Sequence, residues 1–454
     1  MSASEETAAE PEHREVWLAI PGPQPGTVWA DTDGRLPFQA FDLPAGATTV
    51  AALQHDVLPG LGVGGPILAC LLKYDEPWTP ATLVSGLAEL DPQPSGWSPP
   101  RGWRAVDLTD PAVATRLGER VRPDLQHRLV DWAAEQQGAP LDRLTPPWSR
   151  SGWWARATQW VAEQLPGSGP LDVVQVRAWG ISTVLRATDA NGIRHWFKAV
   201  CEHFGREVAI TEVLDGAAPG FVAPVLAADR AQLWLLLGDL PDVTAEDPTS
   251  HTTAYPRLRD LQRSLGAAHA ELVAAGAMLR PLSAVPAAFA EVMADPELAP
   301  WHGRGAERVA ELVAWVQQAV EQVDALGLPD VFVHGDFHPG NVATLPDGTR
   351  VIFDWSDAAI TVPFVDVPTW LTWLDDDPDE RTRVWESFAA GWRDVLPADE
   401  WLARRSLFEG VAGAFHVVSY AGIVRSMDKH RKDEHGRGIT DFVAFVDAAA
   451  APPA

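Results

Sequence analysis

The stretch HGDFHPGNVATLPDGTRVIFDW, residues 334–355, decides the fold of this chain. It places three acidic residues and two histidines around a Pro-Asp-Gly turn. The apolar runs VATL and RVIF flank that turn, and this pattern is typical of a β-hairpin. An ordinary strand pair has no need of so many ionisable side chains, so we expect this hairpin to carry chemistry.

The two ends of the hairpin offer a pair of oxygen ligands. If residues 347–348 form the centre of the turn, Asn341 lies directly opposite Asp354. Directly opposed residues point to the same face of a hairpin, with Cβ atoms ~5 Å apart. An amide oxygen beside a carboxylate suits Mg²⁺, which binds proteins through one or two oxygens and keeps water and phosphate as its other ligands. The register therefore predicts that Asn341 and Asp354 bind Mg²⁺.

The spacing of Asp336 and Asn341 is that of the protein-kinase catalytic loop, in which the Asp accepts the proton of the substrate hydroxyl and the Asn binds metal. Here Gly335 replaces the kinase Arg, and Trp355-Ser356 replaces the Phe-Gly that follows the metal-binding Asp. HGDxHxxN, followed by a hairpin and FDW, resembles the aminoglycoside phosphotransferase/choline kinase-like family, also called the phosphotransferase enzyme family. The resemblance covers about residues 170–440 and is specific, because four residue types recur at fixed spacing.

The resemblance implies roles for the side chains around the loop. Asp336 would be the catalytic base or the group that orients the acceptor hydroxyl, and His334 would orient the loop. Asp366, in PFVDVPTW, would brace the loop through backbone hydrogen bonds. His338 has two interpretations, contact with phosphate or substrate and a hydrogen bond within the loop. Asp357 also has two, binding of a second cation or substrate amine and a solvated turn.

The resemblance also implies a nucleotide-binding lobe with a strand lysine and a helix glutamate. Lys198 ends the apolar strand HWFKAV in a chain with only three other lysines, and it would pair with the α- and β-phosphates of ATP. Glu207 and Glu212 are candidates for its partner on the next helix. We favour Glu207, because REVAITEVL resembles a family pattern in which the earlier Glu is used.

The glycine-rich loop of this lobe is reduced. Only Gly180 is present between the first two expected strands, in RAWGISTVL. Gly180, Ser182 and the nearby N–H groups are the candidates to reach phosphate oxygens. WLLLGDL (234–240) stands where the hinge to the large lobe belongs, so the backbone around Gly238, Asp239 and Leu240 is expected to face the nucleobase.

The fold class predicted from the segment order is α+β. Residues 1–13 read as a disordered acidic tail and 14–145 as a separate α+β domain of unknown role, with a vague likeness to a degenerate Nudix module. A small antiparallel β lobe over 151–240 and a mainly helical lobe over 241–447 would form a bilobal, protein kinase-like fold. Helices are expected at 110–138, 151–165, 202–216, 257–276 and 303–327.

Composition excludes some classes of function. The formal net charge of −27 and pI of about 4.7 disfavour nucleic acid or an anionic membrane as the main partner. Cys70 and Cys201 are the only cysteines, so neither a disulfide framework nor a cysteine zinc site is expected. The most apolar run, 408–424, is interrupted by Glu409 and His416, and the N-terminal residues do not read as a signal peptide. A cytoplasmic protein is expected.

The expected function is ATP- and Mg²⁺-dependent transfer of phosphate to a hydroxyl of a small molecule, such as an aminoglycoside, an amino sugar or a related metabolite. A cationic acceptor is compatible with the acidic composition, which by itself names no ligand. Tyr420 is a further candidate for substrate contact, whereas Trp370 and Trp373, at i,i+3 spacing, are expected in the core. Two alternatives stay open, a pseudokinase-like binding protein and a protein kinase, although the chain has no APE-type segment after Asp354.

Overall fold

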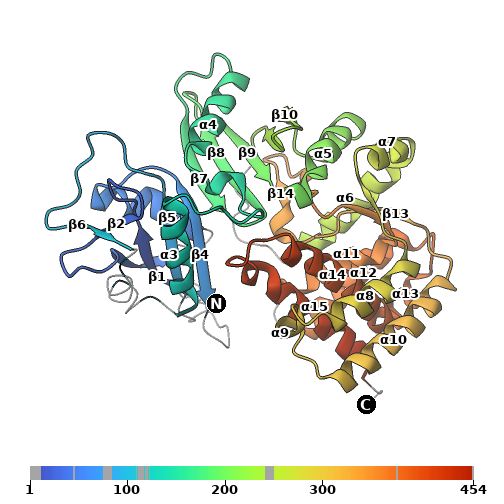
Figure 1. Cartoon of the computed structure of the whole chain (residues 1–454). Helices are drawn as coiled ribbons and strands as arrows, with labels where there is room; N and C mark the ends of the chain where they lie inside the picture. Colours follow the sequence, from blue (N-terminus) through green and yellow to red (C-terminus); the bar gives the residue numbers. More distant parts are fainter. Residues whose placement is uncertain are drawn as a thin grey trace, which may run out of the picture. The chain divides into compact units, whose positions relative to one another are not determined.

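The computed structural model describes residues 12–43, 47–74, 84–108, 110, 117, 121, 123–240, 250–374 and 377–451. The chain divides into two compact units, each described here by itself (Figure 1). The first unit comprises residues 1–199 and 427–434, and the second comprises 200–426 and 435–454. The predicted tail lies mostly outside the described residues, and the predicted domain boundaries stay a prediction.

The first unit contains a mixed sheet, a short strand pair and a three-stranded meander. The mixed sheet has the order β3-β1-β5-β4, in which β1 runs parallel to β5 and the other pairs are antiparallel. The elements of this unit are β1 (Glu12–Ala19), β2 (Thr27–Ala30), β3 (Phe38–Leu43), α1 (Thr49–Ala52), β4 (Ile67–Tyr74), β5 (Val84–Leu90), β6 (Arg104–Asp107), α3 (Pro123–Gln136), α4 (Trp153–Gln164), β7 (Asp172–Ala178), β8 (Ser182–Thr188) and β9 (Arg194–Val200), of which Val200 belongs to the second unit.

Both faces of the mixed sheet are covered, which explains the apolar run in β1. Trp17 packs with Leu125, Leu129 and Trp132 of α3, which lies in front of the sheet in Figure 1. Alternate residues of β1, among them Leu18, join a cluster on the opposite face. A strand buried on both sides needs apolar residues at every position rather than at every second one. The helix predicted over 110–138 is described from Pro123 to Gln136, and much of its first part lies outside the described residues.

The meander β7-β8-β9 matches the strands predicted after residue 171. The β8–β9 turn uses Asn191 and Gly192 as expected, and Gly192 has φ +82°, which glycine adopts without strain. The β7–β8 connection is tight, because the Trp179 N–H donates to the Ser182 carbonyl at 2.9 Å and leaves only Gly180 and Ile181 in the turn.

The second unit is mainly helical, with short strands between the helices. Its elements are α5 (Arg206–Ala217), β10 (Val225–Asp229), β11 (Trp234–Leu237), α6 (His251–Ser264), α7 (His269–Ala274), β12 (Met278–Leu279), α8 (Val285–Ala294), α9 (Ala299–His302), α10 (Ala306–Asp324), β13 (Val331–Val333), β14 (Val342–Thr344), β15 (Arg350–Ile352), β16 (Ala359–Thr361), α11 (Asp366–Leu371), α12 (Pro378–Trp392), α13 (Ala398–Ala403), α14 (Arg405–Arg425) and α15 (Asp433–Ala449), whose first two residues belong to the first unit.

The core of the second unit is one apolar cluster that joins these helices to the small sheet β12-β16-β13. Trp370 is fully buried in it, as expected, but Trp373 is 38% exposed, so the prediction that both lie in the core is wrong for Trp373. Trp373 follows the end of α11, where the chain turns and the i,i+3 relation of a helix no longer holds. The observed order of strands and helices confirms the predicted α+β class.

Among the helices of the described part, α14 alone has the length and hydropathy of a membrane span. However, 67% of its most apolar window is buried within the protein, and the helix contributes Phe408, Phe415 and Val424 to the core cluster. A core helix satisfies the same test as a membrane span, so its composition here is explained by its burial.

The single helix predicted over 257–276 is two helices in the structure. α6 ends at Ser264, a 3₁₀ turn covers Leu265–Ala267, and α7 starts at His269. Gly266 lies in that turn, and glycine in a helix interior costs about 1 kcal/mol relative to alanine. The break therefore has a local cause that the apolar periodicity did not indicate.

Candidate active site

The segment from His334 to Ala358 is an excursion between two paired strands of the second unit. β13 and β16 pair antiparallel, with Val333 opposite Ala359. The chain therefore leaves and re-enters the small sheet at the same edge. This pairing brings the HGD residues and the residues after the hairpin together at that edge, although up to 24 positions separate them in the sequence.

The hairpin register differs by one residue from the predicted one. Val342 pairs with Ile352 and Thr344 with Arg350, so Asn341 is opposite Phe353 and not opposite Asp354. The turn contains three residues, 346–348, and ends at Gly348, which has φ +85°. Pro-Asp-Gly fits a three-residue turn in which glycine takes the left-handed conformation. The predicted register assumed a turn with two central residues, and this assumption caused the error of one residue.

His334 connects the two arms of this excursion. It is completely buried, its Nε2 lies 2.9 Å from the Phe353 carbonyl, and its Nδ1 accepts the Asp336 N–H at 3.3 Å. The carbonyl partner fixes the proton on Nε2. Burial lowers the pKa of His334 to about 4, although the Phe353 hydrogen bond and nearby acids oppose this shift. His334 is therefore a neutral cross-link, which agrees with an orienting role.

Asp366 accepts two backbone hydrogen bonds from the loop. Its Oδ2 accepts the His334 N–H at 3.0 Å and its Oδ1 the Gly335 N–H at 2.7 Å. Burial raises the pKa of Asp366 to about 7 against the effect of these two bonds, and Asp336 raises it further. Gly335 has φ +83°, and a Cβ there would lie 2.2 Å from the Asp357 carbonyl oxygen. Glycine at this position follows from that contact and from the backbone conformation.

Asp336 lies beside His338 at the mouth of the loop. Its Oδ2 is 3.4 Å from the His338 Nε2, and its side chain is 33% exposed. Burial tends to raise the pKa of Asp336, but His338 and His334 outweigh it, so the pKa is lowered. His338 also accepts the Gly340 N–H at 3.1 Å through Nδ1 and stacks on Trp373, with ring centroids 4.3 Å apart. Asp336 is thus an ionised, accessible hydrogen-bond acceptor at neutral pH.

Asn341 and Asp354 approach the same loop from the two arms of the hairpin. The Asn341 Nδ2 donates to the Asp336 carbonyl at 2.9 Å, which leaves Oδ1 as the amide atom that can bind a cation. Asp354 has φ +67°, and with Leu233 it is one of two non-glycine residues with positive φ in the described chain. Such a backbone costs about 1–3 kcal/mol and is found at functional sites. It turns Asp354 out of the strand ladder, where its Oδ1 accepts the Ser356 hydroxyl at 2.6 Å.

Two arginines, Arg206 and Arg280, lie within electrostatic reach of Asp357. Burial raises the pKa of Asp357 to about 7, Asp336 and Asp354 raise it further, and Arg206 and Arg280 oppose the shift. Arg280 donates to the Phe415 carbonyl at 3.0 Å and stacks on the Phe415 ring. Arg206 directly precedes Glu207 in the RE pair, which was the one available signal for it. Arg280 had no such signal.

The loop fits a hard divalent cation. Asp354 tends to raise the pKa of Asp336, and Asp336 and Asp354 both raise the pKa of Asp357, so negative charge gathers at this loop. Within the described residues, no three His, Cys, Asp or Glu side chains form a group that could enclose a metal ion. A site with an amide oxygen and one or two carboxylates is the kind that Mg²⁺ occupies together with phosphate oxygens.

The predicted nucleotide residues lie in both units. Lys198 is half-buried on β9 of the first unit, whereas Glu207 is 2% exposed in the first turn of α5 in the second unit, so their pairing stays a prediction. Ser182 is buried at the start of β8. In the expected hinge, the Gly238 N–H donates to the Pro224 carbonyl at 2.9 Å, so this N–H is already used, while Asp239 is exposed and Leu240 is buried.

Tyr420 lies on α14 within the electrostatic reach of the loop. Burial raises the pKa of Tyr420, and Asp336 and Asp357 raise it further. Its ring packs against Phe442, with centroids 5.4 Å apart, and leaves no room for a Cβ at Gly438. The position of Tyr420 is compatible with the predicted substrate contact, which stays a prediction.

A sequence model described as the phosphotransferase enzyme family matches residues 172–404, slightly more than half of the chain. No curated protein sequence matches. Solved structures with a similar fold include a choline kinase from Streptococcus pneumoniae (12% identity, 64% of this chain and 99% of that chain covered, TM-score 0.45) and a macrolide 2'-phosphotransferase from Brachybacterium faecium (18%, 66% and 99%, 0.43). An aminoglycoside phosphotransferase in a GDP and kanamycin complex is also similar (15%, 65% and 98%, 0.44).

Proposed function

Since this chain belongs to the phosphotransferase enzyme family, we propose that it transfers the γ-phosphate of ATP to a hydroxyl group of a small molecule. Family membership agrees with the resemblance seen in the sequence and with the kinase-like α+β fold. The activity as a phosphotransferase comes from the family. ATP as donor, the hydroxyl as acceptor and the roles of individual residues are parts of the proposal.

The observation that carries the proposal is the loop around Asp336. Asp366 and His334 hold its backbone through buried hydrogen bonds, and Asn341 is tied to the Asp336 carbonyl. The Asp336 carboxylate is left ionised and partly exposed at the mouth of this rigid support. A rigid, accessible carboxylate beside two cation ligands is the arrangement that phosphoryl transfer to an alcohol requires.

In this mechanism the chain positions the reactants and does little covalent chemistry. Asp336 accepts a hydrogen bond from the acceptor hydroxyl, aims its oxygen at the γ-phosphorus and takes the proton as the new O–P bond forms and ADP leaves. Because its pKa is lowered, Asp336 is ionised when the hydroxyl binds, so its main role is orientation. Lys198 would bind the α- and β-phosphates, and support of that lysine by Glu207 stays an expectation from the family resemblance. Mg²⁺ held by Asn341 and Asp354 would neutralise the charge on the phosphates.

The acceptor is proposed to be an aminoglycoside, an amino sugar or a related hydroxyl compound. Contact with a substrate amine was part of one of the two interpretations of Asp357, and Arg206 and Arg280 offset part of the charge of this side chain. A neutral sugar is therefore as compatible with this side of the loop as an amino sugar. The acceptor panel should contain matched pairs of compounds that differ only in an amine.

The proposal is tested by ADP formation from ATP and Mg²⁺ with a panel of amino sugars, neutral sugars, aminoglycosides and amino alcohols, with GTP as a second donor. We expect acceptor-dependent turnover in the wild type. Asp336→Asn should lower it about 10³-fold while nucleotide still binds. Asp347→Asn is the matched control, since Asp347 is exposed in the turn of the same hairpin. Undiminished turnover by Asp336→Asn would rule out the proposed role of the loop.

A second candidate, a nucleotide-binding protein without transfer, is favoured by one observation. The β7–β8 turn has only two residues, which is short for a loop that covers phosphates. Saturable nucleotide binding without turnover across the whole panel would favour this candidate. Phosphate found on added protein, and on none of the small compounds, would favour a protein kinase.

A further inference from the structure

Residues 427–434, which we call the strap, follow α14 and include the first two residues of α15. The strap belongs by its contacts to the first unit, whereas the residues on either side of it belong to the second. It has the sequence MDKHRKDE and contains two of the four lysines of the chain. A segment so rich in charge would ordinarily be a solvated loop, but Asp428 and Arg431 are 6% and 3% exposed.

Two contacts anchor the middle and the end of the strap. Arg431 donates to Asp428 at 2.9 Å through Nη1 and to the Ser149 hydroxyl at 2.8 Å through Nη2. Asp433 forms an ion pair with Lys73 of β4. A buried arginine with two partners is costly to release, because its charge would lose both hydrogen bonds. The strap is therefore held in a defined place within the first unit.

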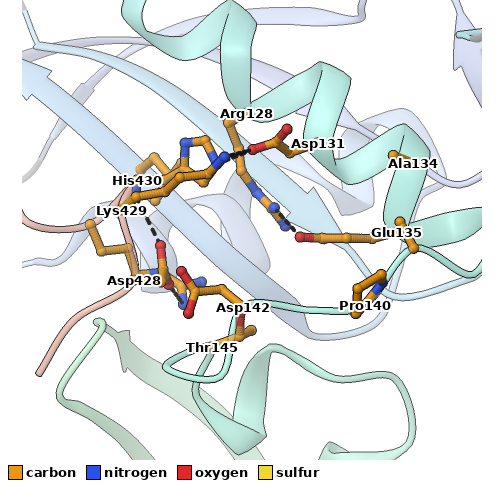
Figure 2. A pocket seen from close by; sticks show the side chains of 13 residues that line it. Arg128, Asp131, Ala134, Glu135, Pro140, Asp142, Thr145, Asp428, Lys429 and His430 are labelled. Atoms are coloured by element: carbon orange, nitrogen blue, oxygen red, sulfur yellow. Dashed lines mark hydrogen bonds and ion pairs between the residues drawn. The ribbon is translucent and has the colours of Figure 1, made fainter.

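A third anchor lies at a cavity of about 320 Å³ between α3 and the strap (Figure 2). His430 Nε2 lies 2.8 Å from Asp131 Oδ2, and Lys429 pairs with the same carboxylate. In Figure 2 these side chains of the strap point toward α3 across the cavity. Arg128, which also lines the cavity, pairs with Glu135 at 2.8 Å. The positive and negative side chains of the lining therefore pair with one another, and they do not indicate which kind of ligand the cavity would bind.

The end of the strap contacts the β7–β8 turn at Gly180. The Gly180 N–H donates to Glu434 Oε2 at 2.7 Å. A Cβ at Gly180 would lie 2.6 Å from Met427 Cε, 3.0 Å from Arg431 Cδ and 3.2 Å from Glu434 Oε2. The space left by the missing side chain is thus filled by the strap. Glu434 Oε1 is 3.9 Å from Arg431 Nε, so that guanidinium offsets part of the carboxylate charge.

We propose that the strap is an autoinhibitory clasp in which the Glu434 carboxylate takes the Gly180 N–H that a phosphate oxygen takes when nucleotide binds. This inference rests on the proposed function, in which Gly180 belongs to the phosphate-binding turn. A carboxylate and a phosphate oxygen are both anionic acceptors for the same donor, so they compete for it. Release of Glu434 also removes a negative charge from beside the incoming phosphates.

Two features make this clasp releasable. The turn contributes one hydrogen bond to Glu434, whereas the partners of the other anchors, Ser149, Lys73 and Asp131, lie outside the turn. Burial raises the pKa of Glu434 to about 7, against the lowering by Arg431 and by the Gly180 hydrogen bond, so the ionised carboxylate is not fully compensated where it lies. Nucleotide binding can therefore displace Glu434 without unfolding the strap as a whole.

The first test compares the KM for ATP of Glu434→Gln with that of the wild type. The variant is isosteric and removes the charge, so we expect KM to fall about tenfold with kcat unchanged, as for the loss of one competing charged hydrogen bond. Asp131→Asn weakens the third anchor without touching the turn, and a smaller fall, about threefold, is expected. Glu163→Gln, an exposed position on α4, is the matched control and should leave both constants unchanged. If Glu434 only stabilised the turn, Glu434→Gln would raise the KM for ATP.

The second test uses a lysine-specific endoprotease, since the chain has lysines only at 73, 198, 429 and 432. A non-hydrolysable ATP analogue with Mg²⁺ should accelerate cleavage after Lys432 in the wild type, because Lys432 lies two residues before the displaced Glu434, whereas Lys429 stays paired with Asp131. Cleavage after Lys198 should slow in the same digest. Glu434→Gln should be cut in the strap at the fast rate without nucleotide.

The outcomes separate the inference from the proposed function. If the wild type transfers phosphate but Glu434→Gln has an unchanged or higher KM, or the analogue protects the strap, the clasp is refuted and the transferase stands. If nucleotide binds without transfer, the dissociation constants of the same variants replace KM and decide the inference. If no nucleotide binds to the wild type or to Glu434→Gln, both ideas fail together.

Discussion

The Asp336 loop and the β7–β8 turn differ in how their conformations are held. In the loop, Gly335 faces the backbone oxygen of Asp357, and buried side chains such as Asp366 and His334 bond to the main chain. In the turn, Gly180 faces the flexible ends of Met427 and Arg431 and a single carboxylate. The difference teaches that a site fixed by backbone contacts is rigid, whereas one covered by side chains can open.

Among the tests of this comparison, Gly335→Ala is expected to have the largest effect. The added Cβ would meet a carbonyl oxygen at 2.2 Å in a backbone with φ +83°, so we expect a loss of about 3 kcal/mol or more in unfolding free energy, together with loss of transfer. Chemical denaturation and turnover measure the two effects. Gly348→Ala is the matched control, since it has φ +85° and open space around it, and about 1–2 kcal/mol is expected there. Equal effects at both positions would contradict the importance of the Asp357 contact.

Asp366→Ala removes the support of the loop without adding any atom. Two buried N–H groups, of His334 and Gly335, would lose their acceptor, and we expect a loss of about 3 kcal/mol. Turnover should fall through kcat, because Asp336 is then poorly placed. Asp366→Asn keeps one acceptor oxygen and should retain part of both. A loss of turnover with unchanged stability would point to direct chemistry by Asp366.

The raised pKa of Asp366 should make the stability of the protein depend on pH. Burial raises the pKa of Asp366 to about 7, while an unfolded Asp has a pKa of about 3.9. Between these values the folded protein holds a proton that the unfolded chain does not, so the stability contributed by this group is lost as the pH rises from about 4 to 7. Urea unfolding at pH 5 and pH 8 should show a smaller drop in Asp366→Asn than in the wild type. Parallel drops would mean that Asp366 titrates normally.

Gly180→Ala tests whether the β7–β8 turn is less rigid than the Asp336 loop. Its Cβ would meet Met427 Cε at 2.6 Å, but the end of a methionine can move, so the expected loss is only about 1 kcal/mol. The strap should become more sensitive to the lysine-specific protease, since its packing partner has changed. A loss of stability as large as that of Gly335→Ala would show that the turn is as rigid as the loop.

The smallest effect is expected for Trp373→Ala. Its stack on His338 is worth about 1 kcal/mol of stability, whereas Trp370→Ala, in the core, should cost about 3–5 kcal/mol. Thermal unfolding of the two variants measures this difference. If His338 needs the stack to keep its place beside Asp336, the pH profile of turnover should shift in Trp373→Ala, and an unmoved profile would limit the stack to stability.

Much of the loop could be predicted because its chemistry is local in sequence. HGDFHPGN and FDW place Asp336, Asn341 and Asp354 through fixed spacing and one hairpin, and short-range geometry needs no knowledge of distant residues. Even there, the register was wrong by one residue, since a Pro-Asp-Gly turn can have two central residues or three. This error of one residue in the register matters little for Asp354, because its positive φ turns the residue away from the hydrogen-bonded strand pair.

The groups that sequence reasoning missed come from far along the chain. Arg280 and Arg206 approach Asp357 from other elements, and neither stands at a spacing that relates it to the loop. Trp373 was assigned to the core because helical periodicity was extended past the end of α11. The strap is the clearest case, since Glu434 contacts a turn 254 positions earlier in the chain.

By itself, the sequence determined the order of strands and helices, the hairpin that follows the HGD residues and the family, because these depend on periodicity, turn residues and spacing within a few tens of positions. Only the tertiary structure decided which charges neutralise Asp357, which carboxylate holds the Gly180 N–H, and which tryptophan is exposed. The physical reason is that burial and electrostatic interaction depend on distance in space, and the sequence encodes that distance only through the packing of the whole chain.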